Sequence, residues 1–314
     1  MKPTKPANRM TRIWHAGILA AALAVVFAIV FGGDIARSAY KLASIAPGDA
    51  SKALPGLKKQ PVDPNAEFLN LIACMAAFHD ENYPRAESYC AQAVRINPTN
   101  PGSRKMLGAV YLMESRYSDA ELHFSAAIAL DPADPDTYAG RGFALRGLGR
   151  FADAGAAFGS AIHLAPGDAQ LWNARCWTRA AGDIALSDAL ADCDQAIKLV
   201  PNYASAYDSR GFTNLRLNRN AAAVKDYSAA IRLRPRFASA LFGRGIARDR
   251  LRQYSAGARD RAAAHKIDPA IDALYASYGF KPAARPGPRH DGPAVKNPSS
   301  ASLDWDFLNV LAAR

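Results

Sequence analysis

The sequence predicts an all-α protein: a solenoid of about six repeated helix pairs, preceded by one transmembrane helix. Three observations predict this fold. A hydrophobic-x-Pro signal recurs every 34 or 35 residues, alanine and aromatic columns recur in step with it, and an uncharged stretch of 18 residues lies near the N-terminus. Because half of the residues are hydrophobic and 21% are charged, the repeated part can bury a core.

The N-terminus has the features of an export signal. Basic residues 2, 5, 9 and 12 precede the apolar stretch 16–33, which as a helix would span about 27 Å, close to the thickness of a bilayer core. This stretch is long for a cleaved signal peptide, whose apolar region usually has about 7–15 residues. We therefore expect a signal anchor with residues 1–15 in the cytoplasm, since basic residues stay on that side. The repeats would then lie in the periplasm of a bacterium, on the inner membrane; the second possibility is secretion after cleavage near residues 36–38.

The repeat is visible in three columns of the sequence. The prolines that end the signal are Pro98, Pro132, Pro166, Pro201, Pro235 and Pro269. Five residues before them stand Ala93, Ala127, Ala161, Ala196, Ala230 and Ala264, and eight before the first five stand Cys90, Phe124, Phe158, Cys193 and Tyr227. Arg261 replaces the aromatic residue in the last unit. Each unit contains two helical patterns, and stacked units can bury apolar faces that one pair cannot.

These motifs resemble the tetratricopeptide repeat family. "LGAVY" at 107–111, with Ala120, Phe124, Ala127 and Pro132, matches that family's motif, and "RGFAL", "RGFTN" and "RGIAR" match its Arg-Gly variant. The resemblance covers residues 67–269. It implies a right-handed superhelix whose concave groove is lined by the first helix of each repeat. It also implies a terminal cap, which we expect at Tyr275, Tyr278 and Phe280.

The predicted organisation has six parts. They are the basic N-terminus (1–15), the transmembrane segment (16–33), a proline-containing linker (34–66), the solenoid with its cap (67–280), a disordered Pro-rich linker (281–301) and a short amphipathic helix (302–314).

Charged residues recur beside the columns of the repeat. Three pairs are expected between the two helices of one unit: Arg175–Asp192, Arg210–Asp226 and Arg244–Asp260. Arg141 faces Ala157 in the same register, so it is expected to lack a partner. The alternative is that all these charges are solvated on outer faces.

One further column faces the groove in the geometry that the resemblance implies. Its members are Met75, Ala109, Phe143, Trp177, Phe212 and Ile246. We expect Met75, Phe143, Trp177, Phe212 and Ile246 to bind an extended or helical peptide with apolar anchors. The alternative is that they only pack between neighbouring helices.

The C-terminal segment 302–314 has an apolar stripe at helical spacing. The predicted docking residues are Leu303, Trp305, Phe307, Leu308 and Leu311. This helix is expected to bind another protein or to fold back onto the chain's own groove. The third possibility is a frayed end that binds nothing.

The four cysteines fall into two matched pairs in the repeat register. Cys74 and Cys176 occupy the small-residue column of the first helix, and Cys90 and Cys193 occupy the aromatic column of the second. The two columns lie at the same height in an antiparallel hairpin. Disulfides Cys74–Cys90 and Cys176–Cys193 are therefore predicted, in agreement with an oxidising compartment. The alternative is four buried thiols.

No residue pattern predicts catalysis. The six histidines are scattered, and no phosphate-binding loop, nucleophile motif or metal-ligand spacing occurs. We expect no enzyme activity, no cofactor, no metal and no nucleic-acid partner. The sequence instead indicates a membrane-anchored, envelope-facing scaffold for protein–protein interactions. The alternative is a non-catalytic accessory subunit of a membrane enzyme or an envelope-assembly complex.

Overall fold

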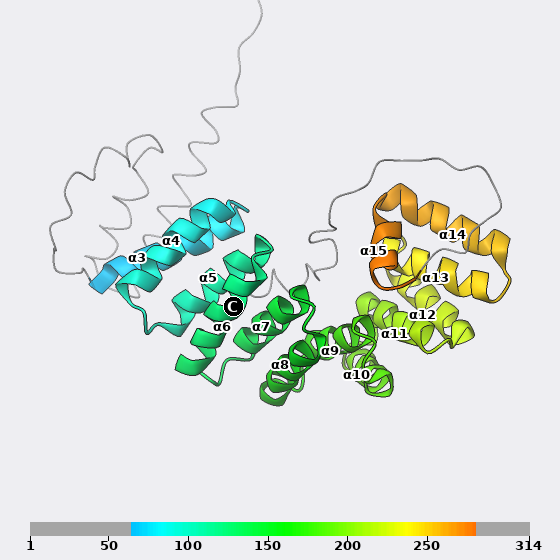
Figure 1. Ribbon diagram of the computed structural model, residues 1–314, viewed down its shortest axis with the longest axis horizontal. Helices are drawn as coiled ribbons and strands as arrows, with labels where there is room; N and C mark the ends of the chain where they lie inside the picture. The colour runs from blue at the N-terminus through cyan, green and yellow to red at the C-terminus, as the bar shows by residue number, and fades with distance from the viewer. Residues whose placement is uncertain (1–63, 281–314) are drawn as a thin grey trace, which may run out of the picture. The chain divides into compact units, whose positions relative to one another are not determined.

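A computed structural model of the chain describes residues 64–280, which contain thirteen α-helices (Figure 1). The helices are α3 (Pro64–His79), α4 (Tyr83–Ile96), α5 (Pro101–Met113), α6 (Tyr117–Leu130), α7 (Pro135–Gly147), α8 (Phe151–Leu164), α9 (Ala169–Ala181), α10 (Leu186–Leu199), α11 (Ala204–Arg216), α12 (Asn220–Leu233), α13 (Ala238–Arg250), α14 (Tyr254–Ile267) and α15 (Ile271–Ser277). The contacts within the chain divide it into two units, Met1–Ile72 and Ala73–Arg314. The features described below belong to the second unit.

The helices form repeating pairs, as the 34-residue period predicts. The first helix of a pair is called helix A and the second helix B; from α5 to α14, every helix A has 13 residues and every helix B has 14. Each helix B packs on its own helix A and on helix A of the next repeat, while α9, α11 and α13 pack on one another in order. The predicted all-α fold of repeated helix pairs is confirmed for the described residues.

Each helix A ends in the same backbone motif. A residue with positive φ follows the helix, and the next N–H bonds back to a carbonyl five residues earlier; in α7, Gly149 has φ +73° and the N–H of Arg150 donates to the carbonyl of Leu145 over 2.9 Å. This is a Schellman motif, which satisfies the last carbonyls of the helix. The other positive-φ residues at these ends are Glu81, Ser115, Asp183, Asn218 and Arg252. The motif therefore reverses the chain at a fixed position in each repeat.

The extra residue of the fourth repeat lies in its turn. After the usual positive-φ residue Asp183, the chain has a second one, Ala185 with φ +44°, directly before α10. Because the insertion is absorbed there, α9 and α10 keep the lengths of the other helices. This explains why the third interval between the prolines, from Pro166 to Pro201, is 35 residues without a change of register.

Helix A and helix B approach each other closely at the small-residue column. A Cβ atom added to Gly108 would lie 3.2 Å from the Phe124 ring, and one added to Gly142 would lie 2.9 Å from the Phe158 ring. Both rings are fully buried. Glycine is needed at these positions because a side chain would overlap the ring from the opposite helix.

The last described segment caps the solenoid. The short helix α15 packs on α13 and is followed by a further Schellman motif, in which Gly279 has φ +82° and the N–H of Phe280 donates to the carbonyl of Tyr275 over 3.0 Å. Tyr275 and Phe280 are buried. The predicted cap is therefore present, and its rings reach beyond the last repeat, as shown below.

Several predicted segments lie outside the described residues. These are the transmembrane segment 16–33, nearly all of the linker 34–66, the Pro-rich linker 281–301 and the helix 302–314. Within residues 64–280, no helix is both long enough and apolar enough to cross a bilayer.

Substituting the column glycine tests the close approach of helices A and B. Gly211→Ala would place a Cβ atom 2.9 Å from the Tyr227 ring, so we expect a loss of about 1–3 kcal/mol and a lower melting temperature. The control is Gly155→Ala in α8, where no atom lies within 4 Å of the added Cβ; it should be neutral or stabilising by up to about 1 kcal/mol. Equal melting temperatures for both variants would contradict the prediction.

Candidate functional site

The predicted binding column lies on one face of the A helices. Phe143 of α7, Trp177 of α9, Phe212 of α11 and Ile246 of α13 occupy equivalent positions, and we call the surface that they mark the A-helix face. Phe143, Phe212 and Ile246 are 1%, 0% and 5% exposed, whereas Trp177 is only partly buried. Of these four side chains, Trp177 is therefore the one that is accessible at the surface, while the other three lie beneath it.

The two remaining members of the column differ from these four. Met75 of α3 is 39% exposed, and Ala109 of α5 is buried. Peptide binding by the column stays a prediction, and the burial of its central aromatic residues limits the contacts that each can make.

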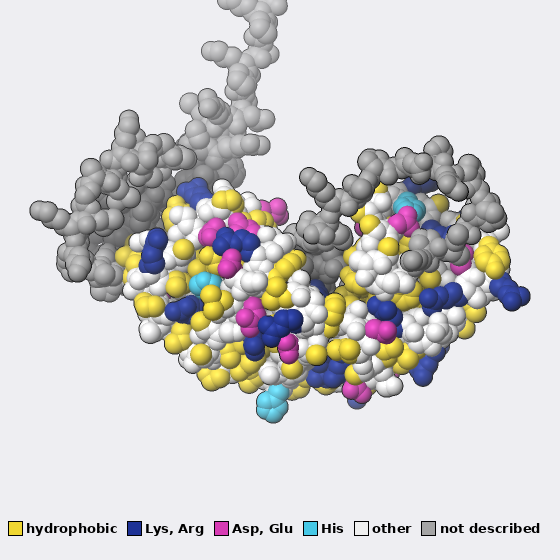
Figure 2. Space-filling model, in the orientation of Figure 1, with side chains coloured by type: hydrophobic (Ala, Val, Ile, Leu, Met, Phe, Trp, Pro, Cys, Tyr) yellow, Lys and Arg dark blue, Asp and Glu magenta, His cyan; other side chains and the backbone are white. Residues whose placement is uncertain are grey.

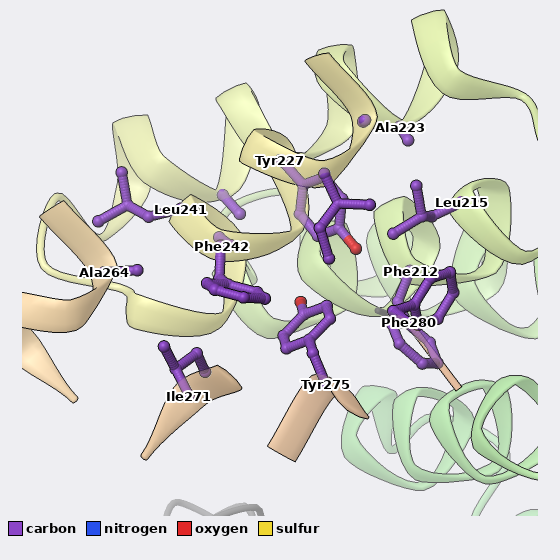
Figure 3. Close-up of a cluster of buried hydrophobic side chains, with 14 of the residues drawn as sticks. Phe212, Leu215, Ala223, Tyr227, Leu241, Phe242, Ala264, Ile271, Tyr275 and Phe280 are labelled. Atoms are coloured by element: carbon purple, nitrogen blue, oxygen red, sulfur yellow. The ribbon is translucent and has the colours of Figure 1, made fainter. Parts of the chain in front are cut away.

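The cap covers part of the A-helix face. The Phe280 and Tyr278 rings each lie 5.4 Å from the Phe212 ring, centroid to centroid, and the Tyr278 ring meets Trp177 edge-on at 5.5 Å. Trp177 in turn packs on Phe212 at 4.6 Å. Figure 3 shows Phe280 beside Phe212, with Tyr275 next to Phe242. The cap residues Tyr275, Tyr278 and Phe280 thus occupy the face over α11 and α13 and extend to the edge of α9.

Two arginines hold the end of the cap. The guanidinium groups of Arg216 and Arg250 lie 5.0 and 5.3 Å from the centre of the Phe280 ring. They also donate to backbone carbonyls of the preceding repeat, Arg216 to Ala181 and Arg250 to Leu215. Burial lowers the pKa of Arg250, which remains a cation in neutral solution. These cation–π contacts hold Phe280 against the A-helix face.

A polar edge lies along the N-terminal ends of the A helices. Asp136 and Asp208 are buried there, on the same face as Phe143 and Phe212 by helical spacing. Ser239 donates to Asp208 over 2.9 Å, and the Tyr275 hydroxyl donates to the Ser239 carbonyl over 2.9 Å. The face therefore combines an apolar centre with carboxylates on one side.

The core beneath the cap has low polarity. Burial raises the pKa of Tyr227 and of Tyr275 well above the ordinary value, so both phenols stay neutral at physiological pH. In Figure 3 their hydroxyl groups point toward each other between α12 and α15. The two neutral phenols therefore contribute to the packing of the core beneath the cap.

The three predicted arginine–aspartate pairs are present. Arg175–Asp192, Arg210–Asp226 and Arg244–Asp260 have N···O distances of 2.6, 2.6 and 2.8 Å. Each aspartate is almost fully buried and has a further donor from the same helix A. These donors are Arg179, Asn214 and Arg248, at 2.6, 2.9 and 2.6 Å. The sequence analysis did not identify them, although each lies four residues after the pairing arginine.

Arg141 has an ion-pair partner, contrary to the prediction. Its Nε lies 3.1 Å from the carboxylate of Glu121 on α6, helix B of the preceding repeat. Arg210 makes a similar contact with Asp194 of the preceding repeat at 2.7 Å. The prediction was wrong because it considered only the two helices of one repeat, whereas the arginine column also reaches the previous helix B.

The arginine-rich last repeat uses its charges internally. Arg244 and Arg248 share Asp260, Arg261 pairs with Asp249, and Arg250 lies on the Phe280 ring. On the surface that Figure 2 displays, Lys and Arg side chains occur beside Asp and Glu at several places. This pairing favours a structural role for these arginines over a free anion-binding patch.

The cysteines pair as predicted. Cys74–Cys90 and Cys176–Cys193 form disulfides with Cα–Cα distances of 5.3 and 5.5 Å, and all four residues are fully buried. In repeats one and four they take the places that glycine and an aromatic ring hold in repeats two, three and five. A bond between the helices thus replaces a ring packed against glycine.

Groups that could hold a metal ion were sought among the described residues. From residue 64 to residue 280, no three His, Cys, Asp or Glu side chains gather in a suitable arrangement.

The fold is similar to solved tetratricopeptide repeat structures. No model of a known family and no curated protein matches the sequence. A tetratricopeptide repeat protein from Parabacteroides merdae ATCC 43184 is 14% identical with a TM-score of 0.58, covering 85% of this chain and 100% of that chain. PilW, a widely conserved type IV pilus biogenesis factor, is 16% identical with a TM-score of 0.60, covering 68% and 99%. At these identities the likeness establishes the fold, a helical repeat of the tetratricopeptide type.

Other repeats have a glycine and an aromatic ring where repeat four has its disulfide. Replacing the disulfide by these two residues tests whether the two kinds of contact are equivalent. Cys176→Ala with Cys193→Ala should lose about 3 kcal/mol, because the crosslink and its packing are both removed. Cys176→Gly with Cys193→Tyr restores a ring against glycine and should retain a higher melting temperature. Equal melting temperatures would contradict the equivalence. As a control, denatured and unreduced wild-type protein should show no reactive thiol.

Removing a buried carboxylate tests the arginine–aspartate pairs. Asp226→Ala leaves Arg210 and Asn214 without their shared acceptor and should cost on the order of 3–5 kcal/mol. The control is Asp153→Ala, whose pair with Arg150 is about half exposed on both sides and should matter by less than about 1 kcal/mol. Urea denaturation of both variants measures the difference, and equal midpoints would contradict a structural role for the buried pair.

Proposed function

We propose that this protein is a non-catalytic scaffold that binds apolar peptide segments of other proteins on its A-helix face. The observation that carries the proposal is Trp177, a partly exposed aromatic residue at the edge of the cap. It is backed by Phe212 at 4.6 Å. An exposed ring supported by a rigid core is a typical anchor point for a peptide.

We further propose that the scaffold faces the cell envelope from a membrane anchor at residues 16–33. The two buried disulfides support this location, because structural disulfides persist in oxidising compartments. The basic residues before the anchor support a cytoplasmic N-terminus and a periplasmic solenoid.

A second candidate is a non-catalytic accessory subunit of an envelope-assembly complex or a membrane enzyme. The fold is shared with PilW, a biogenesis factor for type IV pili, so an assembly role is compatible with this architecture. The two candidates differ in their partners: an adaptor binds several proteins, whereas a subunit co-purifies with one defined complex.

Crosslinking in cells tests the scaffold and its location together. A membrane-impermeant crosslinker, added after the outer envelope is permeabilised, should join the full-length protein to partner proteins. Trp177→Ala should reduce capture at least fivefold. The control Trp172→Ala, on another side of α9 where its indole N–H donates to the Pro166 carbonyl, should leave it unchanged. Equal capture by the two variants would reject the A-helix face, and no capture by wild type would reject an envelope-facing scaffold.

A further inference from the structure

We propose that residues 302–314 bind in cis to the A-helix face, at Trp177 of α9 next to the cap, and compete there with partner peptides. This inference rests on the proposed function, since it names an occupant for the same surface. The occupant is a segment of this chain, and four features of the described residues and the sequence support it.

The first feature is the direction in which the described chain ends. The Schellman motif at Tyr278–Phe280 turns the backbone toward α11, and Phe280 is only 5% exposed against Phe212. The described chain therefore ends on the A-helix face, at Phe280, next to the surface that we propose the following residues cross.

The second feature is that the cap already binds this surface by the same chemistry. Tyr275, Tyr278 and Phe280 contact Phe212, and Tyr278 ends at Trp177. An apolar helix side with Leu303, Phe307 and Leu311 would extend the aromatic cluster along the face.

The third feature is the length of the linker. Residues 281–301 provide a reach of about 25 Å as a flexible chain. Packed helices lie about 8–10 Å apart, and α9 packs directly on α11, so the step from the cap on α11 to α9 is about 10 Å. The linker therefore spans the required distance, and intramolecular binding benefits from an effective concentration in the millimolar range.

The fourth feature is charge complementarity. The linker has Lys281, Arg285, Arg289 and Lys296 but only one acidic residue, Asp291. Asp208 of α11 lies at the polar edge of the face that the linker would follow, next to Ser239 and the cap residue Tyr275. Attraction between these charges favours a path along this edge. A path across Arg216 and Arg250, near the opposite ends of α11 and α13, would bring positive charges together.

The test uses a fluorescent synthetic peptide with the sequence of residues 302–314 and the full-length protein in detergent. In the tail variant, Phe307→Asp with Leu311→Asp, the internal competitor is disabled. We expect this variant to bind the peptide at least tenfold more tightly than wild type does, by fluorescence anisotropy. Adding Trp177→Ala to the tail variant should weaken binding at least fivefold, while adding Trp172→Ala should not.

A matched control adds the same charge on the other side of the predicted helix. Asn309→Asp with Ala313→Asp should bind the peptide as weakly as wild type. If the tail variant binds the peptide no more tightly than wild type, the inference is overturned. Partner capture that depends on Trp177 would still support the proposed function in that case.

A photo-crosslinking residue at position 307 distinguishes cis from trans. In a mixture of tagged and untagged chains, we expect crosslinks within one chain, to peptides from α9 or the cap. Crosslinks between two chains would overturn the inference in favour of a second copy as the occupant. Crosslinks only to other proteins would overturn it in favour of a separate partner.

Discussion

The close approach of helix A to helix B at one level of each repeat is the constraint on which the rest of the structure depends. Where glycine stands on helix A, a ring from helix B packs directly on the backbone, as in Gly142 with Phe158. In the last repeat the aliphatic part of Arg261 lies over Gly245. Two repeats use a disulfide at the same level. The protein therefore satisfies one geometric requirement with three kinds of contact.

The buried carboxylates depend on the same geometry. Asp192, Asp226 and Asp260 each lie one residue before the ring, disulfide or Arg261 of helix B, opposite the arginine that precedes the small residue. A buried ion pair contributes little net stability compared with apolar packing, but an unpaired buried charge is costly. The pairs thus penalise any shift of one helix along the other. Contacts of the arginine column with the preceding helix B extend this control of register from one repeat to the next.

The features that could be predicted from the sequence are those fixed within one repeat. The 34-residue period gave the helix pairs, and the matched columns gave both disulfides and three ion pairs. The partner of Arg141 was missed because Glu121 belongs to the preceding repeat. The reach of the cap was missed for a related reason: the contact of Tyr278 with Trp177 joins segments about a hundred residues apart, and no periodicity encodes it.

The cap has a consequence for recognition that follows from its position. Because Tyr278 and Phe280 lie on Phe212, an incoming peptide cannot use the part of the A-helix face over α11 without displacing residues that Arg216 and Arg250 hold in place. Displacement would expose buried aromatic surface, at a cost of about 25 cal/mol per Å². Under the proposed function, a partner is therefore directed to the partly exposed ring of Trp177. Tyr278 and Phe280 of the cap set this limit on where the solenoid can bind a peptide.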